Sequence, residues 1–318
     1  MREITVKEND QNQSLLKFLS KTLAKMPLTA IHKAIRKGRV RINGKKVTDH
    51  RFMLTRSDVL SLYINDEFFE TEANKFDFLS VKGEVDVVYE DDNILIANKP
   101  PALAVHDFEG GGTDTLINRI IRYLYDKKEY VPENENSFEP ALCNRIDRNT
   151  CGMVIAAKNA QALREINDAI KNHKVNKKYL CLVHGSMQKK SGEVTLYLKK
   201  LADKNMVLVS KKQKPDYKTA VSFYKTLDTK NGYSLLEVAL KTGRTHQIRA
   251  TLSHLGNAIV GDGKYGNTYA QDKQNGFPYQ ALCSYYLSFN LEEGSHLSYL
   301  NEKEFTVSDI WFKNLFYR

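Results

Sequence analysis

Apolar residues recur at helical spacing near the start of the chain. Between Ser14 and Lys25 the leucines predict an amphipathic helix. A second short helix is expected from Thr29 to Lys37, and Gly38 is expected to end it. The sequence therefore predicts two short helices in succession.

The next segment alternates apolar and basic positions around a tight turn. Val40-Arg41-Ile42 and Lys45-Lys46-Val47 flank Asn43-Gly44, a dipeptide favoured in two-residue hairpin turns. The alternation directs apolar side chains inward and basic side chains toward solvent. The exposed basic face is expected to contain Arg36, Lys37, Arg39, Arg41, Lys45 and Lys46. Such a face can contact phosphates, although a merely solvated surface is the simpler explanation for a run of charges.

The periodicity is lost between Asn65 and Glu84, where acidic and aromatic residues alternate irregularly. This loss predicts a connection between two domains. We place a first domain at residues 1–75, a linker at 76–84 and a second domain at 85–318.

Expected strands outnumber expected helices beyond the linker. The strands cover residues 85–89, 94–97, 153–157, 178–183, 219–225 and 234–240. The helices cover residues 113–126, 159–172 and 245–255. Because strands and helices do not alternate regularly, we predict an α+β fold with a mainly antiparallel, mixed sheet rather than a doubly wound fold.

Composition adds a charge argument. The chain has 48 Lys+Arg against 38 Asp+Glu, a net charge of +10, which suggests a polyanionic partner and nucleic acid first. No apolar run is long enough to span a membrane and the first residues do not form a signal peptide, so we expect a cytoplasmic protein without a membrane partner. We also expect a monomer.

The four cysteines carry no metal or disulfide pattern. They contain no Cys-x-x-Cys pair and no histidine at metal-ligand spacing. We therefore expect no metal and reduced thiols.

Asp147 is the candidate for chemistry. It lies between Arg145 and Arg148, in a loop that leads into the apolar segment 153–157. Nearby guanidinium groups lower the pKa of a carboxyl group, and a charged carboxylate is suited to act as a nucleophile or base. From this context alone, an ion pair that holds the loop is the commoner explanation.

The segment 144–152 resembles the His-Arg-Leu-Asp-Arg-x-Thr-Ser-Gly signature of the RluA family of RNA pseudouridine synthases. Further segments resemble the family's Asn-Lys-Pro-x-Gly, Lys-x-Tyr-Leu and Thr-Gly-Arg-x-His-Gln-Ile-Arg motifs and its Gly-Asp turn. In family order, these segments are residues 98–106, 177–185, 241–252 and 256–263. Residues 12–65 resemble the small RNA-binding module named after ribosomal protein S-four.

The resemblance implies an isomerase that converts uridine to pseudouridine in structured RNA. It favours large-subunit ribosomal RNA, with transfer RNA as the other possibility. The reaction breaks the bond from ribose to the uracil nitrogen and rejoins ribose to carbon 5, so no cofactor is expected.

The resemblance also implies roles for single residues. Asp147 would be the catalytic carboxylate, Arg244 would pair with it, and Tyr179 would pack on the target uracil and take part in proton removal. His246 would make a structural or RNA hydrogen bond rather than act as a base. Candidates for substrate or phosphate contacts are Arg145, Arg148, Lys177, Lys178 and Arg249.

Six positions depart from the family patterns, one of them Ala258, which replaces the proline of the Gly-Asp turn. Ser57 and Ala102 stand where glycine is usual, Asn144 and Cys283 where histidine is usual, and Cys151 where serine is usual. We expect the last three to affect RNA contacts, since Asn and Cys lack the charge of a protonated histidine.

Two other functions remain open from the residues. One is an RNA uridine methyltransferase that uses Cys143 or Cys151 as a thiolate. It is disfavoured because no glycine-rich turn for a methyl donor follows the first strand. The other is an RNA-binding protein without catalysis.

Overall fold

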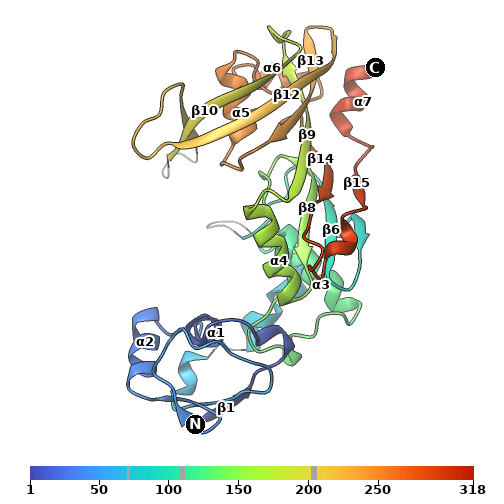
Figure 1. The fold of residues 1–318 in the computed structure, drawn as a ribbon. Helices are drawn as coiled ribbons and strands as arrows, with labels where there is room; N and C mark the ends of the chain where they lie inside the picture. The colour runs from blue at the N-terminus through green and yellow to red at the C-terminus, as the bar shows by residue number, and fades with distance from the viewer. Residues whose placement is uncertain (70–71, 108–111, 202–205) are drawn as a thin grey trace.

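The chain folds into an N-terminal unit and a larger main unit that lie end to end in the computed structural model (Figure 1). No helix among the residues described is long and apolar enough to cross a membrane. The structure describes residues 1–69, 72–107, 112–201 and 206–318.

The N-terminal unit contains a small antiparallel sheet of order β1-β4-β2-β3 and two packed helices. Its elements are β1 (Arg2–Thr5), η1 (Glu8–Asp10), α1 (Leu15–Thr22), α2 (Leu28–Arg36), β2 (Val40–Ile42), β3 (Lys45–Lys46) and β4 (Val59–Leu62). The predicted helix-helix-hairpin order is confirmed. Asn43 and Gly44 both have positive φ, as a two-residue hairpin turn with the strands' twist requires.

The main unit is built around one extended sheet. Its strands are β5 (Val87–Glu90), β6 (Ile94–Lys99), β7 (Ala141–Leu142), β8 (Cys151–Ala157), β9 (Val175–His184), β10 (Ser191–Leu201), β11 (Met206–Ser210), β12 (Lys218–Lys230), β13 (Tyr233–Leu240), β14 (Leu282–Phe289) and β15 (Glu304–Thr306). Its helices are α3 (Leu116–Asp126), α4 (Ala160–Lys171), α5 (Gln247–His254), α6 (Tyr269–Gln274) and α7 (Trp311–Tyr317). Short 3₁₀ helices are η2 (Asp66–Phe68), η3 (Glu72–Ser80), η4 (Pro132–Asn134) and η5 (Ser298–Leu300).

The sheet order places segments from distant parts of the chain side by side. The described strands run β11-β10-β12-β13-β9-β14-β8-β6-β5, with β15 on β14 and β7 on β8. Among these pairs, β14 with β8 is parallel and the others are antiparallel. The predicted α+β class with a mainly antiparallel, mixed sheet is confirmed.

Five strands of this sheet, β7, β10, β11, β14 and β15, were not predicted, and β10 and β14 are the two longest of them. β10 forms a long ribbon with β12 at the far end of the molecule (Figure 1), where alternate positions face solvent and the apolar signal is weak. β14 mixes serine and tyrosine with apolar residues and shows no clean alternation. Only its partners β9 and β8 reveal it as a central strand.

A close backbone contact joins β8 to β14. Gly152 has a φ of +104°, and a Cβ atom built there would lie 2.3 Å from the carbonyl oxygen of Ser284. Any larger residue would force the two strands apart. The start of β8 is therefore fixed against β14.

Two departures from the family patterns occur at left-handed backbone positions. Ser57 has a φ of +72° and Ala102 a φ of +66°. Glycine is usual at such sites because a Cβ atom costs about 1–2 kcal/mol there. Both residues therefore carry local backbone strain.

The segment expected as a linker is anchored on the main unit. Phe78 is buried in the main hydrophobic cluster, and its ring lies 5.4 Å from that of Tyr125 on α3. The N-terminal unit has a separate cluster built from α1, α2 and the small sheet. The two units thus have separate hydrophobic clusters, and Phe78 of the expected linker belongs to that of the main unit.

Polar contacts fix the N-terminal unit to the main unit. Asp10 is fully buried and accepts hydrogen bonds of 2.6 Å from both Ser137 Oγ and Asn136 Nδ2. Asn9 Oδ1 accepts a bond from the backbone of Ala160, at the start of α4. The contact is therefore specific and hydrogen-bonded.

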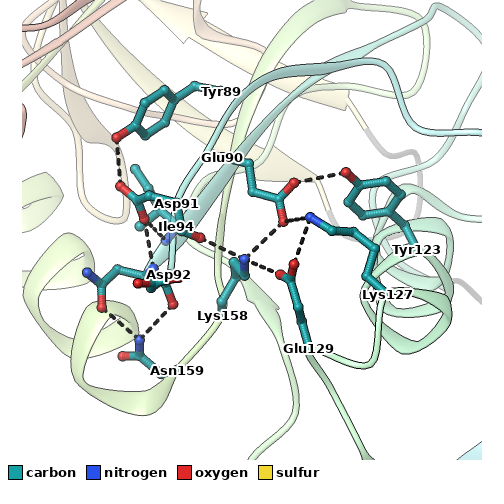
Figure 2. A network of polar contacts seen from close by, with 11 residues as sticks. Tyr89, Glu90, Asp91, Asp92, Ile94, Tyr123, Lys127, Glu129, Lys158 and Asn159 are labelled. Carbon is teal, nitrogen blue, oxygen red and sulfur yellow. Dashed lines mark hydrogen bonds and ion pairs between the residues drawn. The ribbon is translucent and has the colours of Figure 1, made fainter.

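A network of charges ties the end of β5 to α3 and to the start of α4 (Figure 2). Glu90 accepts hydrogen bonds from Lys127 Nζ, Lys158 Nζ and Tyr123 Oη, each at 2.9 Å. Lys158 also contacts Glu129 and the carbonyl of Asp91. Burial opposes ionisation of Glu90, but these donors outweigh it and lower its pKa to about 2.

We expect Glu90→Gln to lower the free energy of unfolding by about 1–3 kcal/mol at pH 7, because the lysines lose their shared carboxylate. The depressed pKa means that this stability is present above about pH 4.5 and is lost as the pH falls toward 2. Urea unfolding at pH 7 and at pH 3 measures the difference.

The matched control is Asp92→Asn, an exposed carboxylate in the same turn. It should change the stability by less than about 0.5 kcal/mol. An equal effect of the two variants at pH 7 would contradict the role given to Glu90.

Candidate active site

The loop that carries Asp147 is fastened at both ends. Asn144 Oδ1 accepts a bond from the backbone of Ile155, and Thr150 N donates to Asp147 O, which closes a turn. The Thr150 hydroxyl accepts a bond from the buried Gln280. These contacts hold the loop between β7 and β8 in one conformation.

Asp147 forms an ion pair with Arg249. Asp147 Oδ2 lies 2.6 Å from Arg249 Nη1, and the aspartate side chain is 28% exposed. One side of the carboxylate is thus reachable from outside while the other contacts a buried cation. A charge-assisted bond of this length favours the ionised carboxylate.

Arg249 is itself held by a second carboxylate. Its Nε and Nη2 donate to the two oxygens of Asp262 at 2.8 Å each, and Asp262 is almost fully buried. Burial alone would lower the pKa of Arg249, but Asp262 and Asp147 raise it above its usual value. The same donors outweigh burial at Asp262 and lower its pKa. Both partners are therefore charged.

The expected ion pair between Arg244 and Asp147 does not form, since Asp147 pairs with Arg249. Arg244 is exposed and its Nε donates to the carbonyl of Thr219 at 3.0 Å. The reason is local: His246 has a φ of +51° and α5 begins only at Gln247, so Arg244 precedes the helix whereas Arg249 lies on its buried face. Arg249, expected to contact phosphate, is buried against Asp262 instead.

A small cleft of about 70 Å³ lies at Asp147. Its lining includes Arg145, Asp147, Tyr179, Arg244, His246 and Arg249. Predicted site residues from three distant segments therefore meet at one place. The volume is far below the roughly 300–1,000 Å³ of a typical small-molecule pocket.

Tyr179 comes to the cleft from β9. Its side chain is buried, with 8% of the residue exposed. Burial raises the pKa of its hydroxyl to about 12, so the phenol is neutral near pH 7. The residue offers an aromatic face and a neutral hydroxyl beside the carboxylate.

His246 makes a structural contact, as expected. Its Nδ1 lies 2.9 Å from the hydroxyl of Tyr265, and its Nε2 lies 3.9 Å from Asp147 Oδ2. Burial lowers the pKa of His246, which favours the neutral ring. The ring helps to pack the turn after α5 against the site.

The other four cations predicted to contact substrate or phosphate lie in different surroundings. Arg145 is exposed and lines the cleft. Arg148 Nε donates to the carbonyl of Ala102, which joins the Asp147 loop to the loop after β6. Lys178 Nζ lies 3.6 Å from Glu237 on the sheet, and burial lowers the pKa of Lys177. Of these four, Arg145 is the one next to the reactive carboxylate.

Lys99 reinforces the same pair of loops from inside. It is fully buried, and its ammonium donates to the carbonyls of Pro100, Leu103 and Arg148 at 2.8 Å each. Only a charged amine can donate to all three. Lys99 is therefore a fixed internal cation under the Asp147 loop.

The basic face of the N-terminal unit is exposed. All six predicted residues are solvent-accessible, and in the described parts of the chain none of the six forms an ion pair with a carboxylate. Arg41 stacks over Tyr63 at 5.5 Å. The six residues in question are Arg36, Lys37, Arg39, Arg41, Lys45 and Lys46.

The sequence reasoning missed the partnership of Arg249 with Asp262. The sequence carried only a weak signal, Asp262 in the glycine-rich turn that follows this helix, because the helix itself mixes polar and apolar residues. It also missed that the three polar departures are structural. Asn144 bonds to backbone, while Cys151 and Cys283 face each other across β8 and β14.

Comparison with known proteins agrees with this geometry. Residues 93–254 match the RNA pseudouridylate synthase family, and residues 15–60 match the S4 domain. An uncharacterized RNA pseudouridine synthase of Mycoplasma capricolum is 33% identical over 316 residues, which cover 98% of this chain and 99% of that protein.

A ribosomal large subunit pseudouridine synthase C of Buchnera aphidicola is 33% identical over 272 residues, covering 83% of this chain and 80% of that protein. The solved structure of human RNA pseudouridylate synthase domain containing 1 shares the fold, with a TM-score of 0.58 at 20% identity. The structural match covers 73% of this chain and 86% of the human chain. The chain belongs to the RNA pseudouridylate synthase family and carries an S4 domain near its N-terminus.

Proposed function

We propose that the chain isomerises uridine to pseudouridine in large-subunit ribosomal RNA, with Asp147 as the catalytic residue. The observation that carries the proposal is the ion pair of 2.6 Å between Asp147 and an arginine immobilised by Asp262. A partly exposed carboxylate with a fixed cation behind it is held in one orientation at the cleft. Relatives named ribosomal large subunit pseudouridine synthase C support the choice of RNA.

The reaction requires the target base to leave its stack. The cleft accepts only a small planar group, so the uracil enters while the rest of the RNA stays outside. The carboxylate of Asp147 acts at the ribose or the base, the bond from C1′ to N1 breaks, and C1′ joins C5. The proton at C5 then leaves and the freed N1 takes up one proton, so the product is an isomer of the substrate. No electron donor or acceptor is consumed.

Tyr179 and the arginines bind different parts of the RNA. The neutral ring of Tyr179 packs on the uracil, which offsets part of the few kcal/mol lost on unstacking. The phenol of Tyr179 is protonated near pH 7. Its oxygen can therefore accept the C5 proton only if it gives up its own hydroxyl proton. Arg145, Arg244 and Arg148 contact the flanking phosphates, and the S4 domain binds RNA through its basic face.

The two other functions are less well supported. A methyltransferase needs an activated thiol at the cleft, but Cys143 and Cys151 do not line it and burial raises the pKa of Cys143 to about 12. A function in RNA binding without catalysis does not explain why the buried Arg249 forms an ion pair with Asp147. We expect the protein to act as a monomer on ribosomal rather than transfer RNA.

We expect Asp147→Asn to abolish pseudouridine formation, by at least about 10³-fold, because the neutral amide cannot act as a nucleophile or base. Its affinity for RNA should change little, since the carboxylate does not bind phosphate. Tritium release from uracil-labelled ribosomal RNA measures turnover and filter binding measures affinity. Wild-type turnover in this variant would refute the proposal.

Arg249→Lys should reduce kcat about 10–100-fold and move the acidic limb of the pH profile upward, because a lysine cannot bridge both carboxylates. Arg244→Met serves as the matched variant on the same motif. It should weaken RNA binding but leave the acidic limb in place. If Arg244→Met moved the limb and Arg249→Lys did not, the partner of Asp147 would have to be reassigned.

Replacing three cations of the basic face should make RNA binding less salt-dependent. For Arg41→Gln, Lys45→Gln and Lys46→Gln combined, the slope of log affinity against log salt should fall by about 2, since each phosphate contact contributes roughly 0.7–0.9. Turnover on a short RNA hairpin should persist. The control combines the exposed lysine substitutions Lys128→Gln, Lys171→Gln and Lys273→Gln. An equal loss of slope in the control would remove the special role of this face.

A further inference from the structure

A second, larger cavity lies beside the start of β8. It measures about 500 Å³, and its inner wall contains Lys99 from β6, Cys151 from β8 and Cys283 from β14. Asp147 and Tyr179 do not line it. Trp311, the chain's single tryptophan, closes one side. The proposed isomerisation leaves this cavity unexplained.

The two cysteines are cross-strand neighbours. Cys283 pairs with Cys151 in the parallel register of β14 and β8, where adjacent strands lie about 4.8 Å apart. A disulfide spans Cα atoms about 4.4–6.8 Å apart, so the bond can form without moving the strands far. The Cys151 thiol donates a hydrogen bond of 3.5 Å to the carbonyl of Leu282, the residue before Cys283.

The surroundings make the two sulfurs unequal. The hydrogen bond from Cys283 and the charge of Lys99 lower the pKa of Cys151 despite burial, while the pKa of Cys283 is raised. Burial raises the pKa of Cys143 to about 12 and also raises that of Cys181. Cys151 is therefore the reactive thiol of the four.

The cavity selects against anions. Glu84, Asp86 and Asp309 are exposed and line its outer part, so a negatively charged reagent is repelled at the entrance. Hydrogen peroxide and small alkyl hydroperoxides are neutral and meet no such barrier. Their size also suits the cavity.

We propose that Cys151 and Cys283 form a redox-active dithiol that takes hydroperoxides and closes to a disulfide. The Cys151 thiolate attacks the outer peroxide oxygen, the O–O bond breaks, and the leaving oxygen takes a proton to become water or an alcohol. Cys283 then attacks the sulfenic sulfur of Cys151, the S–O bond breaks, and the hydroxide leaves as water with the Cys283 proton. One peroxide is reduced and two thiols are oxidised.

The disulfide acts on the site through the start of β8. Its S–S bond of about 2.05 Å is shorter than any contact between unbonded sulfurs, so closing it draws the start of β8 slightly toward β14. Cys151 follows Thr150 and lies four residues after Asp147 in the loop that Lys99 and Gln280 hold. Oxidation therefore displaces Asp147 from Arg249. This regulatory consequence rests on the proposed isomerisation; the dithiol itself does not.

The test titrates the reduced full-length protein with hydrogen peroxide. Peptide mapping should show a cross-link between Cys151 and Cys283, and quenching of Trp311 fluorescence should follow the same curve and reverse with dithiothreitol. Cys151→Ser and Cys283→Ser should abolish both signals, whereas the control Cys143→Ser should keep them. Free thiols, or oxygen adducts on Cys151 without the cross-link, would overturn the proposal.

Turnover is measured in the same samples. Peroxide should reduce isomerisation by the wild type at least about tenfold and leave Cys151→Ser unaffected. A cross-linked protein with full turnover would refute the regulation while the dithiol stands. Absence of turnover in the reduced wild type would instead refute the proposed function, because the cross-link is detected independently of activity.

Discussion

A single buried guanidinium organises the site. Arg249 is almost inaccessible, and a buried cation is tolerated only when carboxylates compensate it. Asp262 satisfies two of its N–H groups, which fixes the plane of the guanidinium and aims Nη1 at Asp147. Without this second carboxylate, Asp147 would sit opposite a mobile side chain in a solvated loop. The catalytic geometry therefore depends on a residue that substrate need not touch.

The order of the sheet brings the other components to Arg249. β8 and β9 both border β14, so the loop before β8 and the middle of β9 lie close together although the chain separates them. Gly152 lets β8 approach the backbone of Ser284, and Ser284 in turn pairs with Tyr179. A central strand that was invisible in the sequence pattern thus sets the distance between the carboxylate and the aromatic ring.

The local features of the fold could be predicted from the sequence. The pairing of strands and of side chains that lie far apart in the chain could not. Asn43-Gly44 determines its own turn, and the leucine spacing determines α1, because these signals act over a few residues. The family resemblance identified Asp147 and placed Arg244 and Tyr179 at the cleft. It named the wrong ion-pair partner for Asp147, Arg244 in place of Arg249, because the partner depends on where α5 begins after the left-handed His246. Nor could it place Cys151 against Cys283, since their contact exists only through sheet register.

The two cavities are coupled through Lys99. Its three carbonyl partners belong to the loop after β6 and to the Asp147 loop, so its ammonium form holds both loops. Burial lowers the pKa of Lys99 to about 7, and the neighbouring negative charges of Cys151 and Asp147 oppose that shift. Conversion of the Cys151 thiolate to a disulfide removes one of these charges and makes the ammonium easier to deprotonate. A neutral amine can donate only two of the three bonds. Sulfur oxidation therefore loosens the loop that carries Asp147 by electrostatics as well as by strand movement.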